Sequence, residues 1–370
     1  MTFTKPKFSH EQNAEFFTTL KKRVNAYFQQ THTATTGDNK MIFKTIFMFS
    51  LYLFPYFFLL FGSVESDLGI LALWILMGFG MAGIGLSIMH DANHGVYSKN
   101  KKLNNLMCYT MNLIGSNAFV WKLQHNVLHH SYTNIDGADE DINMPFVLRF
   151  SPHQKRRWFH RFQHIYAWFL YGLMTLLRVF VSDFRRLKSY KDMNLIPNQK
   201  VFRKELLISI SWKIFYLIYI LAIPLILNPG HIGIYIISFL VMHFICGFIL
   251  AVIFQTAHVM PSCEYPLMND DGKIENNWAV HELITTTNFS PKSRWFSWVI
   301  GGLNYQVEHH LFSNVSHVHY RELSKIVRQT TKEFGLPYNT EKSFFSAIVN
   351  HAKMLRALGN GKLDLAMAKV

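Results

Sequence analysis

The sequence predicts an all-α membrane protein with about four transmembrane helices, further helices in the membrane interface, and a cytoplasmic cap that binds two metal ions. Three observations support this prediction. Half of the 370 residues are hydrophobic and only 16% are charged, whereas about a quarter of the residues are charged in an average soluble domain. Four stretches are apolar enough and long enough to cross a bilayer. Histidines are in excess, with 19 in the chain, and many of them gather beside these stretches.

The four apolar stretches form two pairs. The first pair is Thr45–Val64 and Leu68–Met89. Because only three residues separate them, they predict a helical hairpin. The second pair is Leu206–Leu227 and Ile232–Gln255, with Asn228-Pro229-Gly230 as the turn between them. Each stretch matches the length of about 20 residues that a spanning helix needs.

Other segments are too short or too interrupted to span. Asn105–Trp121 is broken by polar residues, and Gln163–Leu177 is a short apolar stretch between arginines. The second pattern is typical of a helix in the membrane interface. Within the spans, Lys213 is close enough to one helix end to extend its ammonium group to the interface. We expect His243 to be packed or hydrogen-bonded rather than to bind a metal.

The net charge of +14, with His neutral, is distributed unevenly. Lys and Arg occur before the first span, between the two pairs and after the fourth span, and the two short turns carry none. By the positive-inside rule, the basic segments face the cytoplasm. A membrane surface is therefore the expected partner, and nucleic acid is not, because only the net charge favours it. We expect a cytoplasmic N-terminal segment at 1–40, one membrane domain at 41–340 and a cytoplasmic helical tail at 341–370.

The histidines form three clusters, and one further histidine follows the fourth span. The residues are His90-Asp91-Ala92-Asn93-His94, His125-Asn126-Val127-Leu128-His129-His130, Gln306-Val307-Glu308-His309-His310, and His258. In a helix, the i,i+4 pairs place two imidazoles on one face, where their ring nitrogens can share a metal. All of these lie on the predicted cytoplasmic side. Eight imidazoles exceed what one metal can use, so two metals are expected.

The types of side chain in the clusters limit which kind of metal site they can form. Imidazole suits Fe, Zn, Cu or Ni. The zinc protease pattern HExxH is absent, and no Glu has a His three positions later, as carboxylate di-iron proteins require. What remains is a redox-active metal pair with nitrogen ligands, which suits O2 activation against an unreactive C–H bond. We expect the histidines at 153, 160, 164, 317 and 319 to be interfacial or supporting groups.

At these residues the sequence resembles the membrane-bound fatty acid desaturase family. The resemblance covers roughly Leu71 to Arg321 and rests on three boxes in order, HDANH, HNVLHH and QVEHH. The flanking sequence segments HHSYTNIDGADEDI, TTTNFSP and HHLFSNVSHVHY also resemble those of the family. Gln306, where other branches have His, is similar to the front-end desaturases such as linoleoyl-CoA desaturase. These enzymes insert a double bond between an existing one and the carboxyl end.

The resemblance implies a ligand set and its cofactors. The cofactors are two iron ions, with O2 and external reducing equivalents as co-reactants. The implied iron ligands are His90, His94, His125, His129, His130, His258, His309 and His310. Gln306 fills the position of a ninth histidine. The candidates for orienting the ligands are Asp91, Asn93, Asp136, Asp139, Asp141 and Asn288. Helix capping or a place in a polar loop is an equally open role for these residues.

The resemblance also implies partners and a location. It implies that a cis double bond is introduced into a fatty acyl chain carried by CoA or a lipid. No haem-binding HPGG occurs in the sequence, so we expect a separate electron donor, either a ferredoxin or cytochrome b5. That expectation favours a bacterial inner membrane, or the endoplasmic reticulum if the protein is eukaryotic. The basic residues around Arg156 and Arg185 are candidates for a headgroup, a CoA phosphate or an acidic carrier, with a plain interfacial anchor as the alternative.

Two alternative functions stay open at this point. The first is another oxidation on the same di-iron scaffold, by a hydroxylase or an oxygenase of lipids, sphingolipids or carotenoids. Gln306 argues against it. The second is a non-enzymatic membrane metal transporter. The position of the clusters on one predicted side of the membrane argues against a metal path through the bilayer.

Overall fold

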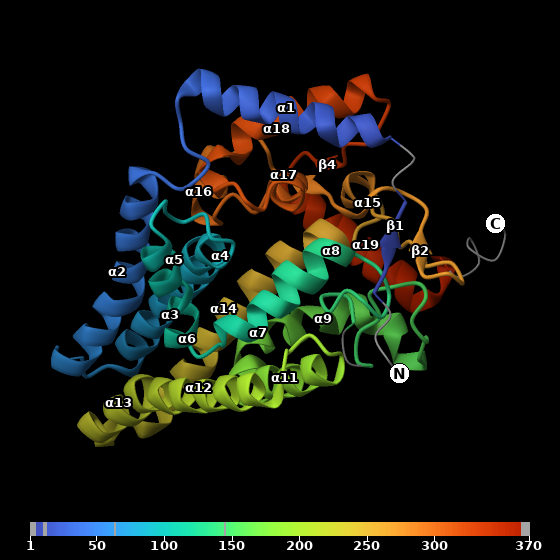
Figure 1. Ribbon diagram of the computed structural model, residues 1–370. Coiled ribbons are helices and arrows are strands. Elements are labelled where there is room, and N and C mark those ends of the chain that lie inside the picture. Colours follow the sequence, from blue (N-terminus) through green and yellow to red (C-terminus); the bar gives the residue numbers. More distant parts are fainter. Residues whose placement is uncertain (1–4, 10–12, 63, 144–145, 364–370) are drawn as a thin grey trace. The chain divides into compact units, whose positions relative to one another are not determined.

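The computed structural model describes residues 5–9, 13–62, 64–143 and 146–363, and these are mostly helical (Figure 1). The chain divides into two compact units. The first unit comprises Met1–Thr36, Gln124–Trp168 and Val252–Val370, and the second comprises Gly37–Leu123 and Phe169–Ala251. Among the described residues the strands are only two residues long. The predicted all-α class is therefore confirmed.

The second unit consists of helices and short π-helical turns. Its elements are α2 (Asn39–Phe61), α3 (Asp67–Gly83), the π-helix η1 (Ile84–Met89), α4 (His90–Asn93), α5 (Lys101–Cys108), α6 (Thr110–Leu113), α7 (Ala118–Lys122), α10 (Met174–Leu177), the π-helix η4 (Arg178–Ser182), α11 (Asp183–Asp192), α12 (Gln199–Leu217), the π-helix η5 (Ile218–Ala222), α13 (Ile223–Leu227) and the 3₁₀ turn η6 (Pro229–His231). Three elements continue from one unit into the other: the π-helix η2 (Leu123–His129), α9 (Gln163–Gly172) and α14 (Ile232–His258).

Within the described residues, four helical runs are long and apolar enough to cross a membrane, as the sequence predicted. They are Asn39–Phe61, Asp67–Asn93, Gln199–Leu227 and Pro229–His258. Their ends differ from the hydropathy boundaries because capping residues set where a helix starts. The carboxylate of Asp38 accepts from the backbone N–H of Lys40 at 2.8 Å, and the amide oxygen of Asn198 accepts from Val201 at 3.0 Å. The first and third spans therefore start several residues before their apolar cores.

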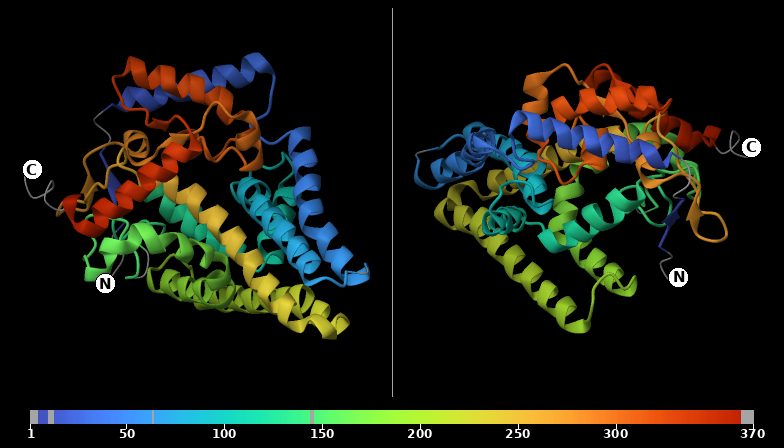
Figure 2. Two further views of the ribbon diagram at one scale, coloured as in Figure 1. Left: turned by 180° about the vertical axis from the view of Figure 1, so that it is seen from behind. Right: turned by 45° about the horizontal axis from the view of Figure 1, so that its top comes forward.

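The predicted hairpin of the first two spans is present, and glycines set its packing. α2 and α3 lie side by side (Figure 2). A Cβ atom at Gly80 would lie 2.7 Å from the backbone nitrogen of Tyr52. A Cβ at Gly83 would lie 2.2 Å from the sulfur of Met48. Small residues at such positions allow two helix backbones to approach closely, which is how helices associate in lipid.

The interior of the second unit is more polar than the sequence predicted. Lys213 does not extend to the interface. It is buried, and its ammonium group donates to Asp183 at 2.9 Å and to the carbonyls of Gly115 and Arg178 at 3.0 and 2.8 Å. The prediction was wrong because a buried carboxylate, distant in sequence, offers a better partner than the headgroup region. His243 is hydrogen-bonded, as expected, with its Nε2 2.7 Å from the hydroxyl of Tyr216.

The two weaker apolar segments are broken helices. Asn105–Trp121 is divided among α5, α6 and α7, with Gly115 in the left-handed region at a φ of 85° between α6 and α7. The region around Gln163–Leu177 is a helix pair, Trp158–Gly172 and Met174–Asp192, bent by 59°. This bend makes a straight span of that length impossible, and it is compatible with the predicted interfacial helix.

The first unit carries helices, 3₁₀ turns and two parallel strand pairs. Its elements are β1 (Lys7–Phe8), α1 (Ala14–Thr31), α8 (His130–Tyr132), the 3₁₀ helix η3 (Trp158–Phe162), β2 (Lys273–Ile274), α15 (Trp278–Thr285), β3 (Asn288–Phe289), α16 (Arg294–Val299), α17 (Gln306–Leu311), the 3₁₀ turn η7 (His317–His319), α18 (Tyr320–Glu333), β4 (Thr340–Glu341) and α19 (Phe344–Asn360). β1 pairs with β2, and β3 pairs with β4.

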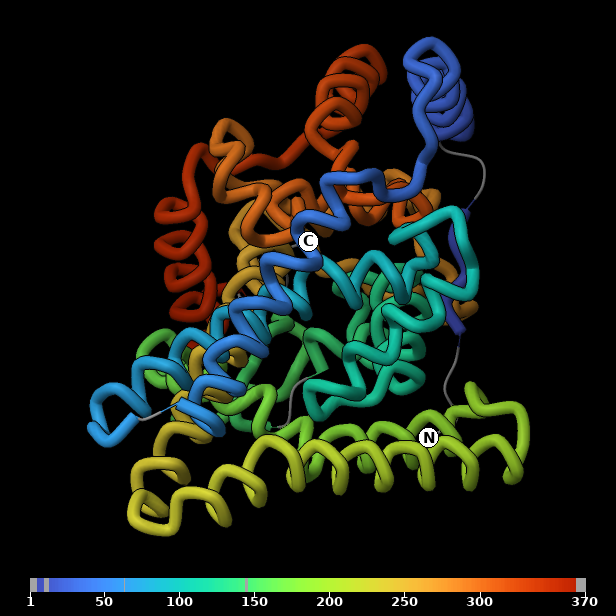
Figure 3. The backbone as a smooth tube through the Cα atoms, turned by 90° about the vertical axis from the view of Figure 1, so that its left-hand side faces the viewer, coloured from blue at the N-terminus to red at the C-terminus, as the bar shows by residue number. Residues whose placement is uncertain are grey.

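The core of the first unit lies beneath two amphipathic helices. α1 and α18 lie side by side, and Figure 3 views them nearly end-on. α1 buries Phe16, Leu20 and Val24, and α18 buries Leu323 and Val327. Along each helix these residues recur every four positions, a spacing that keeps them on one helix face. They pack in one cluster with residues of α15 and α17, so the core supports the helix that carries the third histidine box.

Candidate metal centre

The second histidine box lies on a π-helix rather than on a regular α-helix. η2 continues directly into α8, so His125, His129 and His130 belong to one helical run. A π-helix forms i→i+5 hydrogen bonds and occurs often at functional sites. His125 and His130 are five residues apart, and their Nε2 atoms are 3.1 Å apart. The predicted i,i+4 pair is present, with the His125 and His129 ring centroids 5.3 Å apart, and the π turn also brings the i,i+5 pair together.

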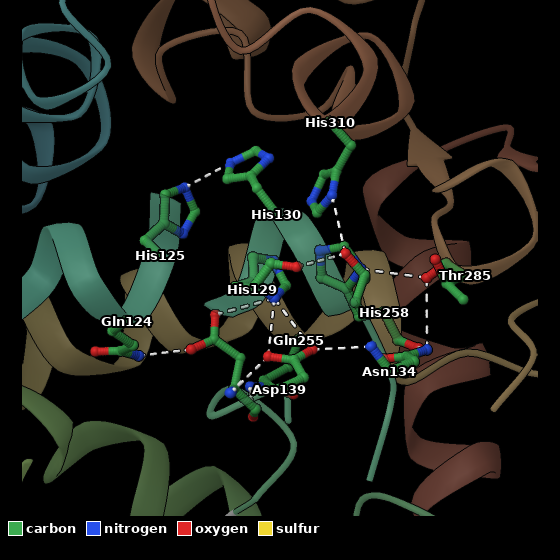
Figure 4. A network of polar contacts seen from close by, with 12 residues as sticks. Gln124, His125, His129, His130, Asn134, Asp139, Gln255, His258, Thr285 and His310 are labelled. Atoms are coloured by element: carbon green, nitrogen blue, oxygen red, sulfur yellow. Dashed lines mark hydrogen bonds and ion pairs between the residues drawn. The ribbon is translucent and has the colours of Figure 1, made fainter. Parts of the chain in front are cut away.

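Three histidines from three different elements form a compact group. His129 comes from η2, His258 from the last residue of α14, and His310 from α17. One ring nitrogen of each lies within 4.8 Å of one ring nitrogen of the others. All three side chains are buried, and Figure 4 shows them pointing toward one another. We call His129, His258 and His310 the three-histidine group.

The Nδ1 atom of each histidine in the group has its own hydrogen-bond partner. Nδ1 of His129 lies 3.1 Å from both carboxylate oxygens of Asp139. Nδ1 of His258 donates to the carbonyl of Thr285 at 3.2 Å. Nδ1 of His310 lies 2.7 Å from Oε2 of Glu282. An N–H bond at Nδ1 leaves the lone pair on Nε2, which is the tautomer that a metal ligand needs.

Nearby carboxylates also act on the charge state of His129. Burial lowers the pKa of His129, but the carboxylates of Asp139 and Asp141 more than compensate and raise this pKa to about 9. Asp139 is itself fixed, because its oxygens accept from the backbone N–H groups of Asn134 and Asp141, both at 2.9 Å. The Asp139 carboxylate therefore has a set orientation before it meets the imidazole.

Asn134 connects the separate segments of the group. Its side-chain amide donates to the carbonyls of His258 and Glu264 at 3.0 and 3.1 Å. Its backbone has a φ of 59°, in the left-handed region that Asn tolerates better than most residues. The loop after α8 is thereby attached to the end of α14, which carries His258.

Glu282 supports His310 from within the core. Its side chain is fully buried, and burial raises its pKa well above the ordinary value of a glutamate. Besides Nδ1 of His310, its Oε2 lies 2.9 Å from the hydroxyl of Thr133. A buried carboxyl group beside an imidazole is the partner that commonly orients a metal-binding histidine. Glu282 was not among the site residues predicted from the sequence. The signal was a charged residue among Val280, Leu283 and Ile284, where charge is rarely buried without a partner.

A second set of histidines lies beside the group in the first unit. Nε2 of His125 is 3.3 Å from Nε2 of His309 and 3.1 Å from Nε2 of His130. Nδ1 of His309 is 3.0 Å from the hydroxyl of Tyr320, the first residue of α18. His125, His129 and Asp141 also offer ligand atoms within 4.8 Å of one another. The first unit therefore brings six of the eight predicted ligands together.

The remaining two predicted ligands, His90 and His94, lie in the second unit. Their ring centroids are 4.8 Å apart, as the predicted i,i+4 spacing requires. Both rings pack edge-on against Trp121, at centroid distances of 5.7 and 5.9 Å. Asp91 lies next to the pair, with its Oδ1 3.7 Å from Nδ1 of His90.

Gln306, Asn93 and Asp141 were also predicted as ligands or supporting residues, and each has its own set of contacts. The amide nitrogen of Gln306 donates to the carbonyl of Leu303 at 2.8 Å, and that of Asn93 donates to Met89 at 2.8 Å. Asp141 accepts from the Gln124 amide at 2.5 Å and lies 3.7 Å from Nδ1 of His129.

Asn288 acts on the third box through the backbone. It accepts from the N–H of Val307 at 2.8 Å and donates to the buried carboxyl of Glu308 at 2.8 Å. The hydroxyl of Tyr338 donates to the same carboxyl at 2.9 Å. Asn288 thereby fixes the start of α17, which carries His309 and His310.

The donor set of the three-histidine group fits one metal ion. Nε2 of His258 is buried and accepts no hydrogen bond in the described structure. Leaving such a group unsatisfied costs about 1–3 kcal/mol, and a metal ion among the three rings would satisfy it. Three imidazole nitrogens are suitable ligands for iron, zinc, copper or nickel. The residues present therefore fit a metal ion of this class.

Comparison with known proteins identifies the family. The family model described as "Fatty acid desaturase" matches residues 68–342. The chain belongs to the fatty acid desaturase family. It is therefore an oxidoreductase, and its membership together with the histidine groups indicates a metal cofactor. Four candidate spans and the family together make it a membrane protein.

Three curated relatives cover almost the whole chain. An acyl-lipid (8-3)-desaturase of Physcomitrium patens is 36% identical over 95% of this chain and 73% of its own length. Two proteins named sn-1 linoleoyl-lipid 6-desaturase are similar at the same level. That of Arthrospira platensis is 32% identical over 97% of this chain and 96% of its own. That of Synechocystis is 33% identical over 94% of this chain and 96% of its own length. These relatives confirm the predicted resemblance to front-end desaturases, and the transporter alternative is no longer needed.

Proposed function

We propose that this desaturase uses two iron ions and O2 to introduce a cis double bond into a lipid-bound fatty acyl chain, as a front-end enzyme. The observation that carries the proposal is the three-histidine group, whose Nδ1 atoms all donate hydrogen bonds to partners of their own. Such a group supplies one ion with three oriented nitrogen ligands. The five other histidines of the boxes, which are His90, His94, His125, His130 and His309, remain for a second ion.

The metal and the protein have separate tasks in this proposal. Bound iron supplies the redox chemistry with O2 that side chains lack. The chain holds the imidazoles in their ligand tautomer through Asp139, Glu282 and the Thr285 carbonyl. It also excludes water, because His129, His258 and His310 are all buried. Positioning of the acyl chain then decides which C–H bond reacts.

The relatives and the charge pattern support the proposed substrate and location. The three relatives described above are named acyl-lipid or linoleoyl-lipid desaturases, which supports a lipid-linked acyl chain here. Reducing equivalents come from a separate carrier, a ferredoxin or cytochrome b5. The basic segments support a metal centre on the cytoplasmic face, and a bacterial inner membrane is the proposed location.

Expression in a host with a known lipid profile tests the function. Wild type, His129→Ala and the exposed control His32→Ala are fed candidate unsaturated acids, and the products are analysed by gas chromatography with mass spectrometry. We expect a more unsaturated acid with wild type and His32→Ala only, with the new double bond on the carboxyl side of an existing one. A hydroxylated product would reassign the protein to the hydroxylase alternative. Full activity of His129→Ala would refute the proposed site.

A further inference from the structure

The first unit contains a surface hollow outside the metal centre. It lies where η3 meets the end of α19 and has a volume of about 430 Å³. This volume is within the range of about 300–1,000 Å³ that is usual for small-molecule sites. The hollow is lined by Arg156, Arg157, Trp158, Arg161, Gly359 and Asn360. We call it the arginine hollow.

The lining of the arginine hollow is strongly positive. Three of its six residues are arginines and none is acidic. In the described part of the chain, none of the three forms an ion pair with a carboxylate. A planar guanidinium group matches the oxygens of a phosphate in a two-pronged hydrogen bond. The chemistry of the hollow therefore favours a phosphate-bearing ligand.

The arginines are held in place before any ligand arrives. The guanidinium of Arg157 lies over the ring of Phe146, 5.1 Å from its centroid. That of Arg161 lies over the ring of Phe162 at 4.6 Å. Arg156 donates to the carbonyl of Asn360 at 2.7 Å. Ordered side chains lose less entropy on binding, so a preformed set binds more tightly than freely moving surface arginines.

The backbone beneath the hollow is tightly packed. A Cβ atom at Gly359 would lie only 2.0 Å from the carbonyl oxygen of His160, so the two backbones are in direct contact. The buried side chain of Arg149 donates to the carbonyl of Leu358 at 2.6 Å. These contacts join the end of α19 to η3. The floor of the hollow is therefore rigid.

Exposed apolar side chains on the same segment indicate which phosphate is bound. Trp158 is 75% exposed, Ile165 is 65% exposed and Phe162 is 44% exposed. Arginine beside exposed tryptophan and aliphatic residues is the pattern of a segment at the headgroup level of a membrane. We propose that the arginine hollow binds the phosphate of a membrane glycerophospholipid whose acyl chain is the substrate. This proposal rests on the proposed function and names its substrate class.

The path from the hollow to the metal centre supports this role. α19 reaches from the hollow to the segment that follows His258, because Nδ1 of His351 donates to the carbonyl of Val259 at 2.9 Å. The hollow and the three-histidine group also belong to the same unit. A headgroup fixed at the arginines would therefore be held at a constant position relative to the ligands, as selection of one C–H bond requires.

Binding is tested without catalysis. The purified full chain in an uncharged detergent is titrated with dioleoyl phosphatidylglycerol, and complexes are quantified by native mass spectrometry. The variant is Arg157→Gln combined with Arg161→Gln. The matched control, Arg328→Gln with Lys332→Gln, removes two exposed charges from α18. We expect affinity to fall about tenfold or more in the variant and less than about twofold in the control, a difference of about 1 kcal/mol.

Further outcomes decide the source of the phosphate. Dioleoylglycerol, which lacks phosphate, should bind wild type and variant alike. Competition by CoA that depends on Arg157 and Arg161 would overturn the lipid assignment. Equal affinity of wild type and variant for phosphatidylglycerol would refute the proposal, because the arginines would then be only a solvated basic surface. Metal content equal to that of wild type and an unchanged elution volume confirm that the variant is folded.

Turnover in liposomes tests the substrate role. We expect the variant to raise KM for phospholipid substrate with little change in kcat, because the arginines act on binding. Lost binding with an unchanged KM would overturn the substrate assignment. Binding by a protein without desaturase activity would instead refute the proposed function alone, so the two failures are distinguishable.

Discussion

The three-histidine group and the His90–His94 pair are held in different ways. In the group, each ring comes from a different element, and its Nδ1 is bonded by a partner outside its own helical turn, such as Asp139 or Glu282. The His90–His94 pair occupies one helical turn, and its rings pack against Trp121. Hydrogen bonds fix both the tautomer and the direction of a ring, whereas packing against an indole fixes mainly its place. The two sets should therefore respond differently to substitution.

Removing a ring from the group should have the largest effect. We expect His258→Ala to reduce desaturation more than about 100-fold, beyond the 10–100-fold effects typical of outer partners. The bound metal should fall by about half, because only one ion depends on this group. Product analysis and elemental analysis of the same preparation measure both. His32→Ala, outside the clusters, serves as the control. Unchanged metal content would show that His258 is not a ligand.

Removing a supporting carboxylate should have the next largest effect. We expect Glu282→Gln to lower metal affinity or activity about 10–100-fold, because the bond to Nδ1 of His310 is weakened. Titration of the metal with a competing chelator measures the affinity. Glu308→Gln is a matched control, since Glu308 is equally buried but bonds to Asn288 and Tyr338. Equal losses in both variants would mean that burial of a carboxyl matters, and not its contact with a ligand.

The His90–His94 pair should depend on its packing against Trp121. We expect Trp121→Leu to destabilise the protein by about 1–3 kcal/mol while most of the metal is retained, because apolar contact is lost and the Nδ1 partners of the group are untouched. Thermal unfolding and metal analysis check this together. Trp295, which is 75% exposed, gives the control Trp295→Leu. If Trp121→Leu lost as much metal as Glu282→Gln, the His90–His94 pair and the three-histidine group would not differ in how they are held.

An added imidazole at position 306 should have the smallest effect. The Gln306 amide donates to the carbonyl of Leu303, so the side chain is bonded within its own turn. We expect Gln306→His to leave the metal content unchanged and to cost about 1 kcal/mol in stability from the lost hydrogen bond. Elemental analysis and thermal unfolding measure the two quantities. Tighter metal binding by this variant would show that position 306 contributes a ligand.

The sequence predicted the spans and the clustering of histidines well, because both are local properties. Hydropathy identifies an apolar helix regardless of its partners, and the i,i+4 spacing of His90 and His94 directly gives their neighbouring rings. Helix ends were less accurate, since caps such as Asp38 and Asn198 extend a helix beyond its apolar core. Lys213 was misjudged because its partner Asp183 is thirty positions away. The domain boundaries at 40 and 340 stay a prediction.

The supporting residues could not be selected from the sequence for the same physical reason. Glu282 and His310 are separated by 28 positions, and Thr133 and Glu282 by 149. No periodicity connects such residues, and only the folded chain shows that they meet. Asn134 gave no signal either, because its left-handed backbone and its bond to the His258 carbonyl appear only in three dimensions.

The π turn of η2 limits how the length of the chain can vary. An α-helix rotates by about 100° per residue, so losing one residue between Lys122 and His130 would turn the following imidazoles away from their partners. Substitutions at its exposed position, Val127, should instead be tolerated. Single-residue deletions across 123–129, compared with substitutions at Val127, would show this as loss of metal in the deletions alone. For engineers who shuffle segments between desaturases, the residue count of this turn has to be kept while its outer side chains can be exchanged.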